Sequence, residues 1–162
     1  MSQVKHYTLN TFIGPLQLQW VNQFKLKSII LPNKIKPQKN DELPEDFRQL
    51  HKELIDYFDG KQTSFTIDLL DLSQCSSFHQ KVYKHIGSMP YGETLKYGEV
   101  AQAVGHKGAA RAVGTAMARN PFPIVIPCHR ILSSNGLGGY GGGLDMKRQL
   151  LSHERCKNIN LI

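Results

Sequence analysis

Residues 97–130 read YGEVAQAVGHKGAARAVGTAMARNPFPIVIPCHR, and this stretch decides how the second half of the chain is organised. Its first apolar residues share one face of a helix, which a glycine then ends: Tyr97, Val100, Ala101 and Val104, followed by Gly105. A second helix is predicted over residues 109–119, with four residues facing inward: Ala112, Val113, Ala116 and Met117. Two short helices joined by a turn that contains glycine indicate a helix-turn-helix.

The second of these helices is unusually rich in alanine and glycine, so a partner can approach its backbone closely. Such an approach suits a nucleic-acid groove, and it suits a tight contact between helices equally well. Asn120 precedes a proline, which disfavours helical backbone and therefore ends the helix. The short apolar run 124–126 then leads directly into Pro127 and Cys128.

The first half of the chain has the pattern of a small sheet with one helix. Residues 7–31 alternate like strands between turn-forming dipeptides, which predicts two or three antiparallel strands. Residues 32–44 read as a loop, and residues 65–69 alternate again and predict a further strand. Between them lies a helix whose apolar residues fall at helical spacing: Phe47, Leu50, Leu54, Tyr57 and Phe58.

Helices are also predicted on either side of the quoted stretch. One runs from Ser76, with Phe78, Val82 and Ile86 recurring every four residues. After a glycine-rich loop over 133–143, a last helix over 144–154 is expected to turn three leucines inward: Leu144, Leu150 and Leu151. The change from strands to helices predicts an N-terminal α/β domain, residues 1–74, and a C-terminal domain, residues 75–162.

The chain of 162 residues is 40% hydrophobic and 20% charged, which is ordinary for a globular protein. Its N-terminus lacks the apolar core of a signal peptide, and no run approaches the roughly 20 apolar residues that span a bilayer. We therefore expect a cytoplasmic protein without a membrane partner, associated with the nucleoid if the source is a prokaryote. The net charge is +7, and residues 91–150 carry seven basic side chains against three acidic ones, which indicates a polyanionic partner.

The three cysteines form no C-x-x-C pair, and their odd number argues against a complete disulfide framework. His153 and Cys156 make one isolated H-x-x-C, so we expect no metal site. Residues 136–141 match G-x-G-x-x-G, but they follow no long parallel strand and no acid lies about 20 residues further on. We therefore interpret this loop as backbone that can approach a flat ligand near Cys128.

The thiol of Cys128 can act as a nucleophile only in its thiolate form. His129 is adjacent, but successive side chains of an extended segment point to opposite faces, so contact requires a turn or a bridging water. Two downstream carboxylates could orient the imidazole. Asp145 lies in the first turn of the last helix, where a carboxylate favours the helix dipole without a catalytic role, whereas Glu154 has no such explanation.

The chain resembles the O6-alkylguanine-DNA alkyltransferases, also called methylated-DNA–protein-cysteine methyltransferases. The resemblance rests on PCHR, on RAVGTAMARNPFPIVI before it, on GGYGGGLDMKRQLLSHE after it, and on MPYGETLKYGEVAQAVG upstream. It implies an N-terminal ribonuclease-H-like domain over 1–74, and a C-terminal helical domain over 75–162 that carries the DNA-binding helix-turn-helix.

The resemblance also implies irreversible, single-turnover repair of DNA. A methyl or other alkyl group of O6-alkylguanine, with O4-alkylthymine as a further candidate, is transferred to Cys128 after the nucleotide is flipped. It makes His129 a base acting through water and Glu154 the carboxylate that orients it. Asn120 becomes a hinge residue and Tyr97 lies beside the rotated phosphate. No cofactor is implied.

Further roles follow from the same resemblance. Arg111 is expected to enter the duplex where the base has left. The substrate pocket is expected to be lined by Met117, Pro123, Ile131, Tyr140 and Gly141. Contacts with the DNA backbone are expected from Tyr97, Gly98, His79, His106 and Ser134. The partner is then double-stranded DNA that carries alkylated guanine, no protein partner is obligatory, and a monomer is expected.

Two departures from the family pattern stand out. Gly141 stands where many members have a serine, and the N-terminal zinc ligands of some members are not apparent. Two alternatives remain from the residues alone. A damage-sensing DNA-binding module needs only the helix-turn-helix and the charge, and a cysteine hydrolase would also use Cys128 and His129.

Overall fold

The computed structural model describes residues 2–156 and begins with a three-stranded antiparallel sheet in the order β1-β2-β3. Its strands are β1 (Lys5–Thr11), β2 (Gly14–Asn22) and β3 (Lys25–Ile30). Leu16, Leu18 and Trp20 alternate along β2 and are buried, because they point to the face that a helix covers. The prediction of two or three antiparallel strands is therefore confirmed.

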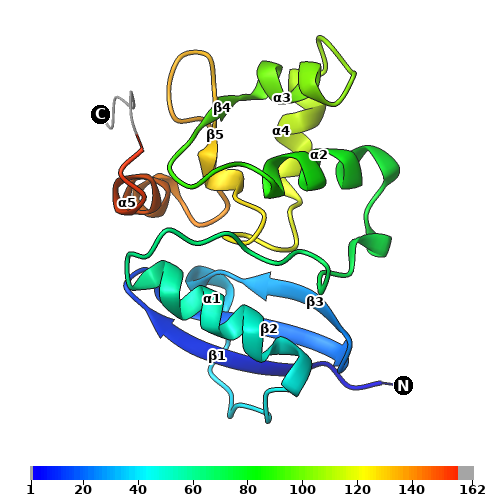
Figure 1. Cartoon of the computed structure of the whole chain (residues 1–162), viewed down its shortest axis with the longest axis vertical. Coiled ribbons are helices and arrows are strands. Elements are labelled where there is room, and N and C mark those ends of the chain that lie inside the picture. Colours follow the sequence, from blue (N-terminus) through cyan, green and yellow to red (C-terminus); the bar gives the residue numbers. More distant parts are fainter. Residues whose placement is uncertain (1, 157–162) are drawn as a thin grey trace.

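Helix α1 (Arg48–Phe58) crosses one face of this sheet, as Figure 1 shows. It follows two 3-10 turns, Pro32–Lys34 and Glu45–Phe47. Leu50, Leu54 and Tyr57 recur at helical spacing and are fully buried, which is the pattern of a helix with one apolar stripe.

The strand predicted over residues 65–69 is wrong. This segment makes no ladder, and only a single parallel bridge joins Leu70 to Leu26. The physical reason is local: Glu53 accepts hydrogen bonds from the backbone N–H of Thr66 at 3.1 Å and from its hydroxyl at 2.9 Å. A side chain thus satisfies a donor whose hydrogen bond a neighbouring strand would otherwise accept, while alternate residues of the segment are still half-buried.

Three helices form the other part of the molecule: α2 (Ser77–Gly87), α3 (Tyr97–Ala103) and α4 (Ala110–Ala118). Ser76 caps α2 by accepting a hydrogen bond from the backbone N–H of His79. In α4 the buried residues are Val113, Ala116 and Met117, which lie three and four positions apart. Ala112 is exposed, so its predicted inward position is wrong, since it lies to one side of this stripe.

The remaining elements are short turns, one two-stranded pair and a last helix. They are a 3-10 turn, Leu72–Gln74, the parallel pair β4 (Leu95–Lys96) and β5 (Ile131–Leu132), the 3-10 turn η4 (Cys128–Arg130) and helix α5 (Leu144–His153). Leu150 and Leu151 are buried as predicted. Leu144 is 43% exposed, which corrects its predicted inward position, because as the first helical residue it precedes the buried stripe.

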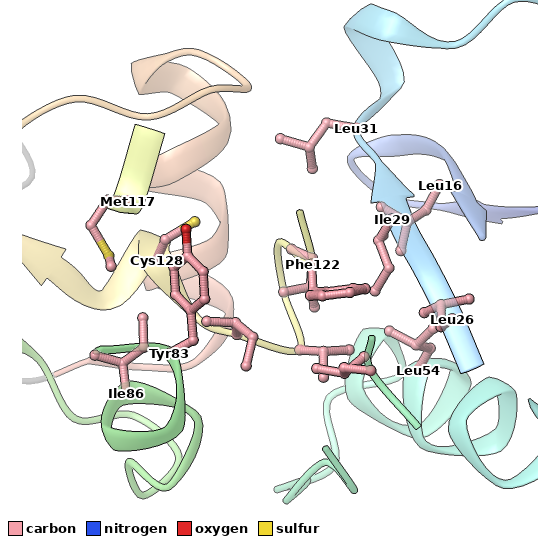
Figure 2. Close-up of a cluster of buried hydrophobic side chains, with 14 of the residues drawn as sticks. Leu16, Leu26, Ile29, Leu31, Leu54, Tyr83, Ile86, Met117, Phe122 and Cys128 are labelled. Atoms are coloured by element: carbon pink, nitrogen blue, oxygen red, sulfur yellow. The ribbon is translucent and has the colours of Figure 1, made fainter. Parts of the chain in front are cut away.

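Residues 122–126 lie between the sheet and the helices and fill the centre of the core. Figure 2 shows Phe122 between Leu16 and Ile29 on one side and Tyr83 on the other. The backbone N–H of Ile29 donates to the carbonyl of Pro121 at 2.8 Å, so β3 is also bonded to the residue that precedes this segment. Burial of one such phenylalanine contributes about 1.5–3 kcal/mol. Within residues 2–156, no helix has the length and apolarity needed to cross a membrane.

Candidate active site

The thiol lies on a tight turn. The N–H of Cys128 donates to the carbonyl of Ile126 at 2.7 Å, and the N–H of Arg130 donates to that of Pro127 at 2.9 Å. The segment is therefore a 3-10 turn and not extended, so the side chains of Cys128 and His129 are not held on opposite faces. Only 7% of Cys128 is exposed.

Asn120 connects the end of α4 to this turn. Its amide nitrogen donates to the carbonyl of Ile126 at 2.8 Å, and its amide oxygen accepts from the N–H of Phe122 at 2.9 Å. A hydrogen bond from its side chain also favours the thiolate of Cys128. The Asn120 side chain thus holds the segment between α4 and Cys128 at both ends, at Phe122 and at Ile126, and it also contacts the thiol.

Glu154 accepts hydrogen bonds from three buried side chains, two of which belong to the turn that carries Cys128. Oε1 lies 2.6 Å from Nε2 of His129 and 2.6 Å from the hydroxyl of Tyr57. The guanidinium of Arg130 donates to Oε2 at 2.7 Å and to Oε1 at 3.2 Å. Asp145, the other carboxylate considered, pairs instead with Arg148 on the surface.

Burial and charge set the protonation of this cluster. Burial would raise the pKa of Glu154, but the His129 imidazole and the Arg130 guanidinium beside it hold the pKa well below its usual range. Burial lowers the pKa of His129 below its ordinary value of 6.5, although Glu154 opposes this shift. At neutral pH the pair is therefore a carboxylate and a neutral imidazole.

Two buried polar atoms beside the thiol have no hydrogen-bond partner in residues 2–156: Nδ1 of His129 and the hydroxyl of Tyr140. The rings of these residues lie 6.4 Å apart, edge to face. Burial raises the pKa of Tyr140 well above its usual value, so its hydroxyl remains a donor. Unsatisfied buried polar atoms on two neighbouring rings are groups that a buried water molecule would satisfy.

The sequence did not predict a role for Lys147. It is fully buried on α5, and its ammonium donates to the carbonyls of Ile131 at 2.7 Å and Gly139 at 3.1 Å. Burial lowers its pKa to about 8, so it is a cation at neutral pH. Burial raises the pKa of Cys128, whereas Asn120 and the Lys147 cation lower it. Its position three residues before Leu150, on the inward face of the helix, could have indicated that Lys147 is buried.

Two cavities meet at the thiol. One, of about 250 Å³, lies against α3 and α4, and the other, of about 150 Å³, extends to β3 and the turn 32–34. Both are lined by the same five residues: Met117, Ala118, Cys128, Tyr140 and Gly141. Tyr97 lines the larger cavity, and Pro123 lines the smaller. Of the predicted pocket residues, Ile131 lines neither and is fully buried, with its carbonyl bound to Lys147.

The hydroxyl of Tyr97 touches the glycine-rich loop. A Cβ on Gly138 would lie 2.7 Å from that hydroxyl, and the backbone at Gly138 has a φ of +72°. Both the close approach and the left-handed backbone therefore require glycine at this position. This observation explains one glycine of the G-x-G-x-x-G pattern through packing against Tyr97.

The residues predicted to contact DNA lie on or near the helices. Arg111 is exposed in the first turn of α4, and Gly98 is exposed in the first turn of α3. His106 is exposed in the turn between these helices, with its ring against Phe78. Ser134 is exposed in the loop after β5, whereas His79 is half-buried with its ring near Tyr83.

The isolated H-x-x-C does not gather ligands. Nε2 of His153 lies 2.6 Å from the carbonyl of Tyr57, and the thiol of Cys156 lies 3.8 Å from Glu154. In the part of the chain that the structure describes, no three histidine, cysteine or acidic side chains come together as metal ligands.

A buried thiol at a cavity lined by two short helices, followed in sequence by an imidazole that pairs with a carboxylate, is the arrangement expected of a protein with a nucleophilic cysteine. Comparison with known proteins makes this class specific. A family model described as 6-O-methylguanine DNA methyltransferase, DNA binding domain, matches residues 77–156.

Curated relatives match nearly the whole chain. A methylated-DNA–protein-cysteine methyltransferase of Mycobacterium tuberculosis is 40% identical over 156 residues, which covers 94% of this chain and 93% of the relative. That of Mycobacterium leprae is 41% identical over 151 residues, covering 91% and 90%. The chain belongs to the family of methylated-DNA–protein-cysteine methyltransferases, and the resemblance identified in the sequence is confirmed.

Solved structures agree with this assignment. The crystal structure of the Mycobacterium tuberculosis O6-methylguanine methyltransferase matches with a TM-score of 0.79 and 36% identity, over 98% of this chain and 96% of that one. The structure of Mycobacterium tuberculosis OGT in complex with DNA matches with a TM-score of 0.79 and 38% identity, over 93% of each chain. The mixed α/β fold is therefore that of known members.

Proposed function

We propose that this protein repairs O6-alkylguanine in double-stranded DNA by transferring the alkyl group to its own Cys128. The observation that carries the proposal is the position of the thiol, where two cavities meet and on the same turn as His129, which pairs with Glu154. In the reaction, sulfur bonds to the alkyl carbon while the bond from that carbon to guanine O6 breaks. The electron pair stays on the guanine, which takes up the proton that the thiol loses.

The arrangement supports a path for that proton. Ionised Glu154 can only accept, so Nε2 of neutral His129 carries the hydrogen and Nδ1 carries the lone pair. Nδ1 is the buried atom without a partner in residues 2–156. A water beside Nδ1 and the hydroxyl of Tyr140 would pass the proton of Cys128 to His129. Glu154 then stabilises the imidazolium that forms.

Helices α3 and α4 are proposed to form the helix-turn-helix that binds DNA. The exposed face of α4 carries Ala112 and Ala118, which allow the backbone to approach the floor of a minor groove. After the nucleotide is flipped, Arg111 would fill the gap that is left in the base stack. Flipping costs a few kcal/mol, and it costs least for a poorly paired base. Tyr97, Gly98, His106, Ser134 and His79 are proposed to contact the DNA backbone or the flipped nucleotide.

The larger cavity is proposed to receive the flipped guanine. Tyr97 lies on its wall, with its hydroxyl positioned at the glycine-rich loop, and can donate a hydrogen bond to the departing base. Met117, Tyr140 and Gly141 line the same space, and Pro123 lines the adjoining cavity. Asn120 is proposed to hold the turn that carries Cys128, which fits its hydrogen bonds.

The domain organisation is also a proposal. We infer an N-terminal ribonuclease-H-like domain, residues 1–74, which the sheet and α1 support, and a C-terminal DNA-binding domain, residues 75–162. Transfer from O4-alkylthymine is part of the same proposal. We also propose that the protein acts as a monomer, because one chain contains every group that the reaction needs.

The test uses duplex DNA that carries a labelled methyl group on guanine O6. We expect about one label per protein chain with the wild type, and none with Cys128→Ser. Binding of the damaged duplex without transfer of label would instead favour a damage-sensing module. Repeated hydrolysis of an acyl substrate, lost in Cys128→Ser, would favour a cysteine hydrolase.

A further inference from the structure

The smaller cavity at the thiol has a wall from the first half of the chain. It extends from Cys128 past Pro123 to the end of β3 and to Lys34. Figure 2 shows Leu31, which follows β3, on the side of this space opposite Cys128 and Met117. The reaction centre is therefore enclosed on this side by residues that lie outside the helical part.

Lys34 brings a positive charge to this cavity. Its backbone N–H donates to the carbonyl of Leu31 at 3.0 Å, which fixes the turn, and Asn33 beside it donates to the carbonyl of Gly141 at 3.2 Å. The ammonium of Lys34 lies 3.8 Å from the point that a Cβ on Gly141 would occupy. The absent side chain at Gly141 thus leaves the ammonium next to the cavity, in van der Waals range of its wall.

Within residues 2–156, no carboxylate opposes this charge at the cavity. The lining contains one lysine and no acidic residue: Ser28, Ile29, Ile30, Leu31, Lys34, Met117, Ala118, Asn120, Pro121, Pro123, Cys128, Tyr140 and Gly141. The other polar side chains there are uncharged at neutral pH. An anion that enters this space meets a positive potential from Lys34 and little repulsion.

The geometry of the transfer directs part of the substrate into this cavity. Sulfur attacks the alkyl carbon from the side opposite guanine O6, so these three atoms lie nearly in line. Whatever else is attached to that carbon must leave the line at a steep angle. With guanine in the larger cavity against α3 and α4, the smaller cavity is the space that remains beside Cys128.

We propose that Lys34 makes this protein favour alkyl groups that end in a carboxylate, such as the carboxymethyl group of O6-carboxymethylguanine. The proposal rests on the proposed function and names a substrate class for the same site. The bond from sulfur to the CH2 carbon forms as the bond from that carbon to O6 breaks. Cys128 becomes S-carboxymethylcysteine, and guanine keeps the electron pair and takes the thiol proton.

The experiment compares two adducts of nearly equal shape in the same duplex: O6-carboxymethylguanine, which is an anion, and O6-carbamoylmethylguanine, its neutral amide. Second-order rate constants for transfer to Cys128 are measured for the full chain. We expect a higher rate constant for the carboxymethyl adduct. In Lys34→Met the ratio of the two rate constants should fall by roughly two- to fivefold, the range of an exposed ion pair.

Two further variants make the result specific. Lys34→Arg keeps the charge and should retain most of the ratio. Lys36→Met removes a charge two residues away, at an exposed residue that does not line the cavity, and should leave the ratio unchanged. Raising the salt concentration should lower the ratio of the two rate constants in the wild type, because salt screens exposed charges.

Three outcomes would overturn the proposal: equal ratios in wild type and Lys34→Met, equal losses with both adducts, or no transfer from either adduct. Equal losses would show that Lys34 contacts DNA or supports the fold. Methyl transfer from O6-methylguanine is measured alongside. If the wild type transfers methyl but Lys34→Met leaves the ratio of the two rate constants unchanged, only this proposal fails. If no alkyl group is transferred from any adduct, the proposed function itself is contradicted.

Discussion

At the scale of single residues, Lys147 shows how burial changes what a side chain does. A lysine ammonium without water costs several kcal/mol unless its donors are satisfied, and here two carbonyls from different segments accept them. The same cation lies close enough to Cys128 to favour its thiolate. One residue therefore holds the glycine-rich loop to β5 and tunes the nucleophile.

Replacing Lys147 by methionine should move the pH dependence of transfer. Burial raises the pKa of Cys128 and the Lys147 cation opposes that shift, so removing the cation raises the pKa of the thiol further. The midpoint of the curve of transfer rate against pH should then move to higher pH. The measurement is single-turnover methyl transfer across the alkaline range.

Arg148→Met is the matched control, because it removes the neighbouring cation, which pairs with an exposed carboxylate. Its midpoint should stay at the wild-type pH. A Lys147→Met midpoint equal to that of the wild type would contradict an electrostatic role and leave only the structural one.

At the scale of elements, α4 has one buried stripe and one face of small exposed residues. Gly114 lies between them, and a Cβ placed there would meet no atom within 4 Å, so glycine is not required by packing. Its backbone is helical, where glycine costs about 0.5–1 kcal/mol relative to alanine. Gly114 also lines the larger cavity, which connects the helix to the proposed base-binding space.

Two substitutions at Gly114 should therefore separate stability from function. Gly114→Ala should raise the free energy of unfolding by about 0.5–1 kcal/mol, measured by urea denaturation. Gly114→Leu should remain folded but fill part of the cavity and slow methyl transfer at least tenfold. Normal transfer by a folded Gly114→Leu variant would show that the base does not enter this cavity.

The elements also show what the sequence could predict. Periodic apolar residues located the helices and the three strands, because each of these elements buries one face. The alternation of Phe65, Ile67 and Leu69 is equally real, but Glu53 takes a backbone donor of that segment, and alternation carries no information about such a partner. The role of Lys147 could not be predicted for a similar reason. Its hydrogen-bond acceptors are carbonyls in other segments, and only the tertiary fold brings them together.

The candidate site divides in the same way. Cys128, His129 and Glu154 could be identified from residue types and the resemblance, whereas Tyr57 could be predicted only as a buried helix residue. Its hydrogen bond to Glu154 joins positions 97 residues apart. A contact of that range depends on how the sheet with α1 packs against the helices, which no local pattern encodes.

At the scale of the whole molecule, this contact makes the site a joint product of both halves of the chain. Tyr57 comes from α1, Arg130 and His129 from η4, and Glu154 from the end of α5. Phe122 and its neighbours fill the space between these parts. Disturbing the charge of the cluster should therefore affect the stability of the whole fold.

The fold should lose stability as the pH falls from neutral. The pKa of His129 is lower in the folded chain than its ordinary 6.5, so the unfolded chain binds a proton first and stability falls below about pH 6.5. The lowered pKa of Glu154 acts in the same direction below its ordinary 4.5. The measurement is the free energy of unfolding from urea denaturation at several values between pH 7.5 and 4.

His129→Gln removes one titrating group and should flatten the part of the curve between pH 6.5 and 5. Each unit by which folding shifts the pKa corresponds to about 1.4 kcal/mol. His85→Gln, at a half-buried histidine on α2, is the control and should keep the wild-type slope. Equal slopes in all three proteins would mean that His129 is not held neutral by the fold.

The small exposed fraction of Cys128 has a consequence for the lifetime of the protein. Because the thiol reacts only once in the proposed function, each reaction with peroxide or a soluble electrophile would inactivate one molecule of the protein. Burial limits access and keeps the sulfur mostly protonated, which slows oxidation, since oxidants attack the thiolate. In the proposed reaction this enclosure requires the base to be extruded, and it also preserves the unreacted protein until the protein meets damaged DNA.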